Sequence, residues 1–317
     1  MMKALQRTSY GNWSNLKMHE VDMPKPAKGE VLIEVEYVGV DSSMNHLMTG
    51  TPGLVRMGTG LRKPKSPGVG QSFSGIVRGV GSNESKFAVG DRVFGIGSSV
   101  LASFALAKES KIASIPAWLD LERAATFPVS ALAANAALKL ASKNLESALV
   151  IGGSGSVGSF LMQMLAIRGV RTIASASSNK HGWVKSLGAS EAINHAQVRD
   201  LSRSSFDTIF LIGGDESFRE LRKLLRPGGN IVVVGSDQRG SKFAGGFLAT
   251  ALVSLFSRGK VKLVVSVEKP ELLLEVANLL RDQVSIAGRS ASFDDAVQAI
   301  KHYQSGETKG RLVIKVG

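Results

Sequence analysis

The sequence predicts an α/β protein, with a doubly wound parallel sheet and a second, mainly antiparallel and partly barrel-like domain. Three observations indicate this fold class. The first 120 residues read as strands and turns, strands and helices alternate over the middle of the chain, and a glycine-rich turn joins one of these strands to a helix. With 317 residues, the chain can form two domains that each have a core.

Residues 1–120 have the pattern of an antiparallel β-domain. Residues 30–38 and 75–80 alternate apolar and polar positions, and residues 89–95 read as a turn into a further strand. Glycine and proline interrupt the chain densely between residues 50 and 70. We therefore expect a mainly antiparallel, partly barrel-like domain here.

The pattern changes near residue 120. Asp120 is expected to cap a short helix, and Pro128 to begin an alanine-rich helix that ends near Leu140. The alternation that follows is typical of a parallel sheet with right-handed crossovers. Strands are predicted at residues 148–151, 171–174, 208–212 and 230–234, and helices near residues 156–168, 180–187 and 216–225.

After residue 260 the chain is expected to return to the first domain. The prediction there is a strand, two helices and a final strand, at residues 261–265, 270–281, 293–303 and 311–316. The predicted domains are residues 1–120 together with 260–317, and residues 121–259.

A phosphate-binding turn is predicted where the apolar strand 148–151 runs into Gly153, Gly155 and Gly158. This is the spacing of a dinucleotide-binding turn, in which the first glycine allows the tight turn and the second lets a pyrophosphate approach the backbone. The third lets the helix pack closely on the strand. Backbone N–H groups and the positive end of the helix dipole then face the phosphates. The candidate phosphate-binding residues are Gly153, Ser154, Gly155, Ser156, Val157 and Gly158.

The composition, 44% hydrophobic and 21% charged, is that of a soluble globular protein. The chain has no cysteine, which excludes disulfides, thiolate zinc sites and a cysteine nucleophile. Residues 1–10 lack the apolar core of a signal peptide, and no apolar run is long enough to span a bilayer. We expect a cytoplasmic protein.

The net charge of +13 attracts anions, such as a phosphorylated cofactor, an acyl thioester, anionic lipid or nucleic acid. Because the basic residues are scattered and aromatic residues are sparse, specific nucleic-acid binding is not expected. The most apolar helix candidate, residues 247–256, is interpreted as part of a core or a subunit interface, with peripheral membrane contact as the less favoured alternative.

Short motifs occur in a characteristic order along nearly the whole chain. They are residues 39–50, Pro67-Gly68 ahead of Gly75, and residues 89–95, 124–128, 152–158, 186–189, 206–214, 225–229 and 309–314. In this order the chain resembles the medium-chain dehydrogenase/reductase superfamily, in its zinc-free quinone oxidoreductase branch with ζ-crystallin-like and reticulon-interacting-protein-like members. The resemblance implies a GroES-like barrel domain and a Rossmann domain.

Zinc-dependent members of this superfamily have a cysteine where this chain has Asp41, and a His-Glu pair where it has Val69-Gly70. The four-cysteine structural zinc lobe is also missing. Valine cannot ligate a metal, and one carboxylate is not a site. We therefore expect no metal.

The segment expected at the end of the second parallel strand favours NADPH over NADH. In this fold an acidic residue there binds the ribose 2′-hydroxyl and repels a 2′-phosphate. Residues 173–183 contain no acid, but they contain Ser177, Ser178 and Lys180, which suit a phosphate. His195 stands where relatives often carry a tyrosine near the adenosine. The alternative is that these residues form a solvated turn and helix start.

The resemblance also implies a site for the nicotinamide and a small electrophilic acceptor. Zinc-free members resembling this chain transfer a hydride from NADPH to a quinone or to the β-carbon of an α,β-unsaturated carbonyl. Residues 41–48, with Thr126, Phe127 and Ala133, are the candidate lining of the acceptor pocket. Thr126, Gly213 and Gly235 are the remaining candidate cofactor-binding residues, and the two glycines would let the backbone approach the nicotinamide and ribose.

Asp41, Asn45 and His46 are the candidate catalytic residues. His46 stands where many relatives have a tyrosine and would donate a hydrogen bond to the acceptor carbonyl. Asp41 would orient His46 or a ribose hydroxyl. The alternative, given equal weight, is that Asp41 and His46 only hold a loop in place through hydrogen bonds.

Two other functions are open at this point. One is reduction of an enoyl thioester. The other is a catalytically weak NADPH-binding protein that acts through its basic surface on lipid, RNA or a partner. Because relatives are often homodimers that pair their cofactor domains edge to edge, we also expect a homodimer, with contact through the 230–234 strand and the 247–256 helix.

Overall fold

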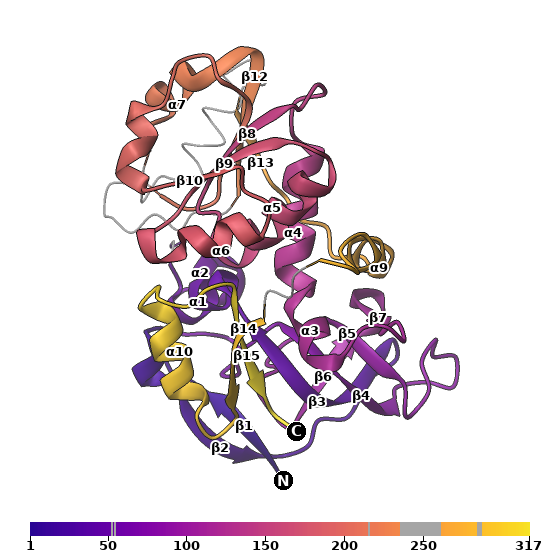
Figure 1. The fold of residues 1–317 in the computed structure, drawn as a ribbon. Coiled ribbons are helices and arrows are strands. Elements are labelled where there is room, and N and C mark those ends of the chain that lie inside the picture. The colour runs from indigo at the N-terminus through magenta and orange to yellow at the C-terminus, as the bar shows by residue number, and fades with distance from the viewer. Residues whose placement is uncertain (52, 54, 215, 235–260, 284–286) are drawn as a thin grey trace. The chain divides into compact units, whose positions relative to one another are not determined.

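The computed structural model describes residues 1–317 except 52, 54, 215, 235–260 and 284–286. Its contacts divide the chain into two compact units. The first consists of residues 1–132, 268–281 and 285–317, and the second of residues 133–267 and 282–284. Both ends of the chain therefore belong to the first unit (Figure 1).

The first unit is a mainly antiparallel β-structure of the GroES-like type. A seven-stranded sheet has the order β14-β15-β3-β4-β5-β7, with β6 paired to β3, and β1 and β2 form a separate antiparallel pair. Only the β14–β15 pair is parallel in the seven-stranded sheet. The strands are β1 (Met2–Gln6), β2 (Lys17–Val21), β3 (Glu30–Val40), β4 (Ser72–Val80), β5 (Arg92–Ile96), β6 (Phe104–Lys108), β7 (Ile112–Ser114), β14 (Ala287–Ser292) and β15 (Arg311–Lys315).

Strand β3 is the centre of this sheet because it pairs with β15, β4 and β6. Its apolar alternation buries Val31, Ile33 and Val35. A register shift between Val35 and Tyr37 then moves the buried positions to Val38. This irregularity lets one long strand present apolar side chains to the core along its whole length.

The helices of the first unit include two that the sequence did not predict. Residues 1–120 read as strands and turns in the sequence, but α1 follows β3 directly and α2 follows α1. The cap expected at Asp120 is present, since its carboxylate accepts from the Arg123 N–H at 2.7 Å. The helices are η1 (Trp13–Asn15), α1 (Ser42–Thr49), α2 (Val55–Thr59), η2 (Glu109–Lys111), α3 (Leu121–Thr126), α9 (Pro270–Leu279) and α10 (Ala296–Gln304), and α4 (Pro128–Lys139) continues into the second unit.

The second unit is the predicted doubly wound parallel sheet of the Rossmann type. Its six strands have the order β10-β9-β8-β11-β12-β13 and all pair in parallel, so the chain enters at the middle, winds to one edge and then to the other. The strands are β8 (Ser147–Ile151), β9 (Arg171–Ser175), β10 (Glu191–Ile193), β11 (Phe206–Leu211), β12 (Leu225–Val233) and β13 (Val261–Leu263). The helices are α5 (Ser156–Ile167), η3 (Ser178–Lys180), α6 (His181–Ser186), η4 (His195–Asp200) and α7 (Phe218–Leu224).

Several details of this sheet differ from the sequence prediction. The strand predicted at residues 261–265 as part of the first domain is β13 of this sheet, and β10 was not predicted. Strand β12 begins at Leu225, five residues before the predicted strand, and the Pro227-Gly228-Gly229 turn lies inside it as an irregularity of the ladder. β12 is also not an edge strand, because β13 pairs with its other side. The predicted helix at 247–256 lies outside the described residues.

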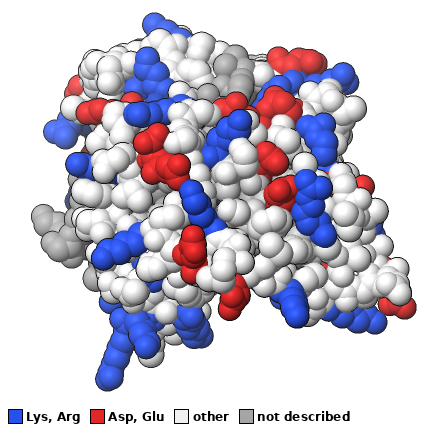
Figure 2. All heavy atoms as spheres, turned by 90° about the horizontal axis from the view of Figure 1, so that it is seen from below, with Lys and Arg blue, Asp and Glu red and all other residues white. Residues whose placement is uncertain are grey.

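No helix among the described residues is long and apolar enough to cross a bilayer. Figure 2 shows Lys and Arg side chains interspersed with Asp and Glu over the face drawn there. On that face the excess of positive charge is therefore mixed with negative charge.

The buried side chain of Arg311 joins four segments of the first unit. Its Nη2 atom donates to an oxygen of Asp41 at 2.5 Å, to the Gly39 carbonyl at 3.1 Å and to the Ser72 hydroxyl at 2.8 Å. Its Nη1 atom donates to the carbonyl of Thr126. The guanidinium thus connects the beginning of β15 to the end of β3, the beginning of β4 and the end of α3.

Asp207, at the beginning of β11, has a similar role in the second unit. Its carboxylate, 13% exposed, accepts from the N–H groups of Glu146 and Ser147 at 3.0 and 2.9 Å and from the Ser147 hydroxyl at 2.9 Å. Arg226 lies 3.2 Å away. Although burial by itself raises the pKa of Asp207, these hydrogen bonds and the Arg226 charge lower it below the usual value.

We predict that Asp41→Ala lowers the free energy of unfolding by about 3–5 kcal/mol, because it leaves the fully buried Arg311 cation without its counterion. The double change Asp41→Asn with Arg311→Met should cost less than the sum of the single changes, because it removes both charges. Urea unfolding followed by circular dichroism measures the stability of Asp41→Ala, of the double variant and of its two single variants. A loss below about 0.5 kcal/mol for Asp41→Ala would show that this ion pair does not stabilise the fold.

We predict that Asp207→Asn lowers stability by about 1–2 kcal/mol at neutral pH. Because the folded-state pKa is lowered, the carboxylate's contribution is complete above the unfolded-state pKa of about 3.9 and disappears as the pH falls through the folded-state value. Thermal unfolding at a series of pH values should show the two proteins converging only in this acidic range. Asp200→Asn, at an exposed residue of the same unit, should change nothing, and a constant difference at all pH values would refute the linkage.

Candidate functional site

The glycine turn of the second unit has the geometry of a phosphate-binding loop. It follows β8, and Gly155 forms the N-cap of α5 with no side chain to satisfy the first N–H groups of the helix. Gly152 has the positive φ, +89°, that the tight turn requires, so this turn is made one residue earlier than Gly153. Gly158 is required for close packing, because a Cβ there would collide with Gly152 and lie 2.7 Å from the Gly153 Cα atom.

Two glycines at the carboxyl ends of the strands leave the backbone open near this turn. A Cβ at Gly155 would meet only the Gly152 carbonyl oxygen, at 3.7 Å, and a Cβ at Gly213, beyond the end of β11, would meet nothing within 4 Å. Gly155 and Gly213 therefore leave their backbone open to approach, whereas Gly158 does not. Ser154, Ser156 and Val157 lie in the turn and the first turn of α5. Gly235 lies outside the described residues.

Ser175 links the glycine turn to His195. The Ser175 carbonyl accepts from the N–H groups of Gly152 and Gly153 at 3.2 and 3.3 Å. Its hydroxyl lies 2.6 Å from Nδ1 of His195. His195 is exposed at the beginning of η4, just after β10. The structure thus joins the carboxyl ends of β8, β9 and β10 in one hydrogen-bonded group, which the sequence analysis did not foresee.

The residues proposed for a 2′-phosphate lie in the same place. Ser177 and Ser178 are exposed immediately after β9, and the Ser178 hydroxyl donates to Asn194 at 2.7 Å. Lys180 follows them but is only 7% exposed, so it is not part of a fully solvated turn. No acidic residue occurs between residues 173 and 183.

His46 and Asn45 lie on α1 in the first unit. Nδ1 of His46 is 2.7 Å from the Thr51 carbonyl oxygen, so this nitrogen carries a proton and donates it. The other ring nitrogen, Nε2, is then protonated only when the imidazole is cationic. The Asn45 side chain accepts from Gln304 at 2.7 Å, which ties α1 to α10.

Asp41 caps α1 and neutralises Arg311. Its carboxylate accepts from the Met44 N–H at 3.1 Å, as an N-cap residue does, and pairs with Arg311. Its other partners are the hydroxyls of Ser43 and Ser130. Within the described part of the chain, His46 is not among the partners of this carboxylate. Asp41 therefore positions the helix that carries His46.

Thr126 belongs to the same network. It ends α3, its hydroxyl donates to the Arg123 carbonyl at 2.7 Å, and its own carbonyl accepts from Arg311. Motifs in the sequence pointed to Thr126 and Asp41 but not to Arg311, the residue that joins them. The available signal was a charged residue that begins an otherwise apolar strand. Among the described residues, no group of three His, Asp or Glu side chains converges as metal ligands.

Two family models match the chain. The model described as alcohol dehydrogenase GroES-like domain matches residues 27–117, and the model described as zinc-binding dehydrogenase matches residues 156–258. The quinone oxidoreductase of Homo sapiens is 30% identical to this chain over 250 residues, which are 74% of each protein. The 2-methylene-furan-3-one reductase of Solanum lycopersicum is 28% identical and covers 99% of this chain and 79% of its own.

A solved structure shares the whole architecture. The quinone oxidoreductase from Coxiella burnetii matches with a TM-score of 0.86 and 25% identity, over 100% of this chain and 99% of its own. Together with the barrel, the parallel sheet and the glycine turn, these matches show that the chain belongs to the quinone oxidoreductase branch of the medium-chain dehydrogenase/reductase superfamily and is an NAD(P)-dependent oxidoreductase.

Proposed function

We propose that this chain uses NADPH to reduce a quinone or an α,β-unsaturated carbonyl, without zinc. The observation that carries the choice of cofactor is the end of β9. There two exposed hydroxyls and Lys180 stand where an NAD-specific site has an acidic residue. A 2′-phosphate would meet donors and a cation instead of a repelling carboxylate.

The glycine turn would hold the pyrophosphate and the group around Ser175 and His195 the adenosine end. The bound nicotinamide supplies the hydride, which is the difficult part of the chemistry. What the protein adds is orientation and a charge-stabilising donor near the carbonyl oxygen of the acceptor. His46 is the candidate donor, and Asn45 and Thr126 are candidate lining residues.

Zinc independence rests on the residues at the positions where zinc-dependent relatives have ligands. Asp41 is already engaged by Arg311 and by the helix N–H of Met44, and Val69 is a buried apolar residue with no ligating atom. A metal at this position would have to displace a buried cation from its carboxylate. This supports a zinc-free reaction even though one matching family model is described as zinc-binding.

The acceptor class is proposed from the relatives. The human and Coxiella proteins are quinone oxidoreductases, and the tomato protein reduces a 2-methylene-furan-3-one, which is an enone. Both acceptors accumulate negative charge on a carbonyl oxygen when they receive a hydride, so one donor serves both. A panel of quinones, enals, enones and enoyl thioesters, followed by loss of nicotinamide absorbance, tests the proposal. Binding of NADPH without turnover of any acceptor would overturn it in favour of a non-catalytic protein.

We infer a homodimer from the family, with a different contact from the one that the sequence suggested. Edge-to-edge pairing of two parallel sheets requires an edge strand. Among the described strands the two edges are β10 and β13, since β11 and β13 cover both sides of β12, and we place the contact at β13. Val265 and Val267, which follow β13, are 74% and 50% exposed and would be buried by such a contact.

We predict that Lys180→Ala combined with Ser177→Ala weakens NADPH binding by about tenfold or more and changes NADH binding by less than about twofold. The reason is that only NADPH carries the phosphate that these side chains would meet. Titration calorimetry with both cofactors measures the effect. Lys185→Ala, at an exposed lysine on the adjacent α6, is the matched control. Equal losses for the two cofactors would refute the assignment.

We predict that His46→Ala lowers turnover by about tenfold or more while NADPH affinity stays nearly constant. Because Nδ1 already donates to Thr51, His46 can donate from Nε2 only as imidazolium. His46→Gln, whose amide also donates, should restore part of the turnover. A His46→Ala variant that keeps the wild-type turnover would reduce His46 to a structural residue.

A further inference from the structure

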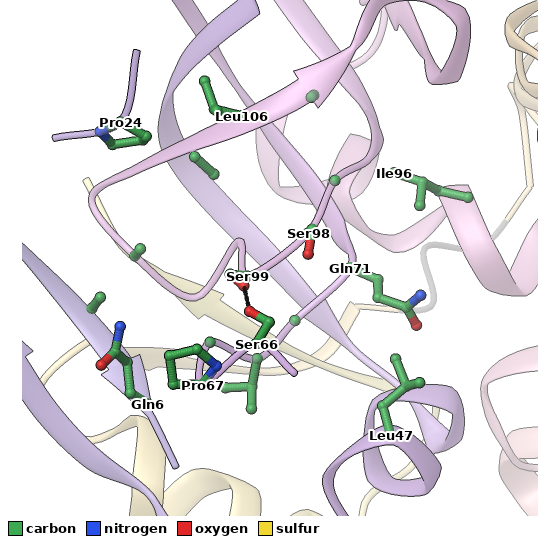
Figure 3. Close-up of a pocket in the computed structure, with 18 of the residues that line it drawn as sticks. Gln6, Pro24, Leu47, Ser66, Pro67, Gln71, Ile96, Ser98, Ser99 and Leu106 are labelled. Carbon is green, nitrogen blue, oxygen red and sulfur yellow. Dashed lines mark hydrogen bonds between the residues drawn. The ribbon is translucent and has the colours of Figure 1, made fainter. Parts of the chain in front are cut away.

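A cavity of about 740 Å³ lies within the first unit, apart from the glycine turn. Residues from β1, from the loop 64–71 and from the segment 96–99 line it. In the view of Figure 3, Ser66 and Ser99, joined by a 3.0 Å hydrogen bond, lie between Gln6 on one side and Leu47 on the other. Its lining is thus mostly apolar and hydroxyl-bearing, and its volume is that of a small-molecule site.

Arg7 belongs to the wall of this cavity. It follows β1 directly, and its N–H donates to the Pro67 carbonyl at 2.8 Å, which places it beside the loop that lines the cavity. Its side chain lies over the ring of Tyr10, 5.6 Å from the centroid. The Tyr10 hydroxyl is 2.7 Å from that of Thr59, which also lines the cavity. The backbone of Arg7 is therefore bonded to a lining residue, and its guanidinium lies beside Tyr10, which is itself bonded to one.

The Arg7 cation has no counterion among the described residues. Arg7 is only 5% exposed, and its Nε atom is buried with no hydrogen-bond partner in the part of the chain that the structure describes. Burial lowers the pKa of Arg7, but arginine stays protonated in proteins. Its contact with the Tyr10 ring compensates only part of the lost hydration. The fully buried Arg311 also has an unpartnered Nε in the described part of the chain, but its Nη1 and Nη2 atoms have a carboxylate and three further acceptors.

A buried, unpaired guanidinium at a small-molecule cavity is the arrangement that recognises an organic carboxylate. The planar fork of arginine pairs with two carboxylate oxygens at once, and one positive charge matches one negative charge. Besides Arg7, the lining contains three lysines and three carboxylates, so its net charge is one positive unit and suits a ligand with one negative charge. We propose that this cavity binds a small organic monocarboxylate whose carboxylate pairs with Arg7 and whose apolar body extends toward Leu47.

The consequence for catalysis rests on the proposed function. Met44 and Leu47 line the cavity and lie on α1, the helix that carries His46. The acceptor that this chain reduces would then be an enone or quinone that also carries a carboxylate.

Binding of 3-benzoylpropionate and of its methyl ester tests the site, because the ester has one added methyl group and lacks the negative charge. Titration calorimetry should show that the wild type binds the acid about tenfold or more tightly than the ester. Arg7→Met should remove this preference by weakening the acid alone, and Arg7→Lys, which keeps the charge but not the fork, should lie between. Arg56→Met is the matched control, since Arg56 lies on the same Tyr10 ring, 4.7 Å from its centroid, but is not a lining residue.

A second measurement separates this inference from the proposed function. Arg7→Met should also melt at a higher temperature than the wild type without ligand, because it removes a buried unsatisfied N–H group. A wild type that binds acid and ester equally would overturn the site, whether or not any variant folds. Turnover is then measured with 3-benzoylacrylate, the corresponding enone acid, and with its methyl ester. If the acid preference in binding is present but NADPH reduces neither this acid nor its ester, the site stands and the enone assignment does not.

Discussion

The ion pair between Arg311 and Asp41 is the interaction on which the arrangement of the first unit depends. A guanidinium removed completely from water is costly unless its donors meet well-placed acceptors, and here Nη1 and Nη2 meet oxygens from β3, β4, α3 and the cap of α1. Arginine suits this position because its fork reaches several acceptors in one plane. Asp41 in turn caps α1. The position of His46 therefore follows from a charge pair that is not itself part of the chemistry.

The second unit holds its candidate site together through hydrogen bonds at the ends of neighbouring strands. Ser175 is the common element, since its carbonyl receives the glycine turn and its hydroxyl meets His195. A parallel sheet brings the carboxyl ends of neighbouring strands to one edge, so short polar contacts suffice there. The ribose and phosphate contacts proposed for Ser177 and Lys180 depend on this edge and not on any long-range pairing.

Much of the fold could be predicted from the sequence because its signals are local. The parallel strands are continuous apolar runs, Asp120 is a recognisable cap, and the glycine turn lies between a strand and a helix. The failures have a common cause in non-local contacts. Helix α1 is short and polar, and forms where Asp41 caps it and Arg311 fixes Asp41. Strand β14 has little apolar character and pairs in parallel with β15.

The site shows the same division. The glycine turn could be predicted from the spacing of its glycines, and the serines after β9 from the alternation of strands and helices. The contact between Ser175 and His195, the carboxylate partner of Arg311 and the lack of one at Arg7 all depend on which segments meet in space. A charged residue beside apolar strand positions is visible in the sequence, but its partner is not, because the two lie 270 residues apart in the case of Arg311 and Asp41.

That separation has a consequence for how the protein is made on the ribosome. Asp41, Gly39 and Ser72 are synthesised before the second unit, whereas Arg311 emerges only after all of it. The second unit lies almost entirely within one continuous stretch, residues 133–267, and can acquire its structure while translation continues. In the first unit, Asp41 cannot form its ion pair until β15, which begins with Arg311, has been synthesised. Synthesis thus imposes an order of assembly in which the unit that starts first is completed last.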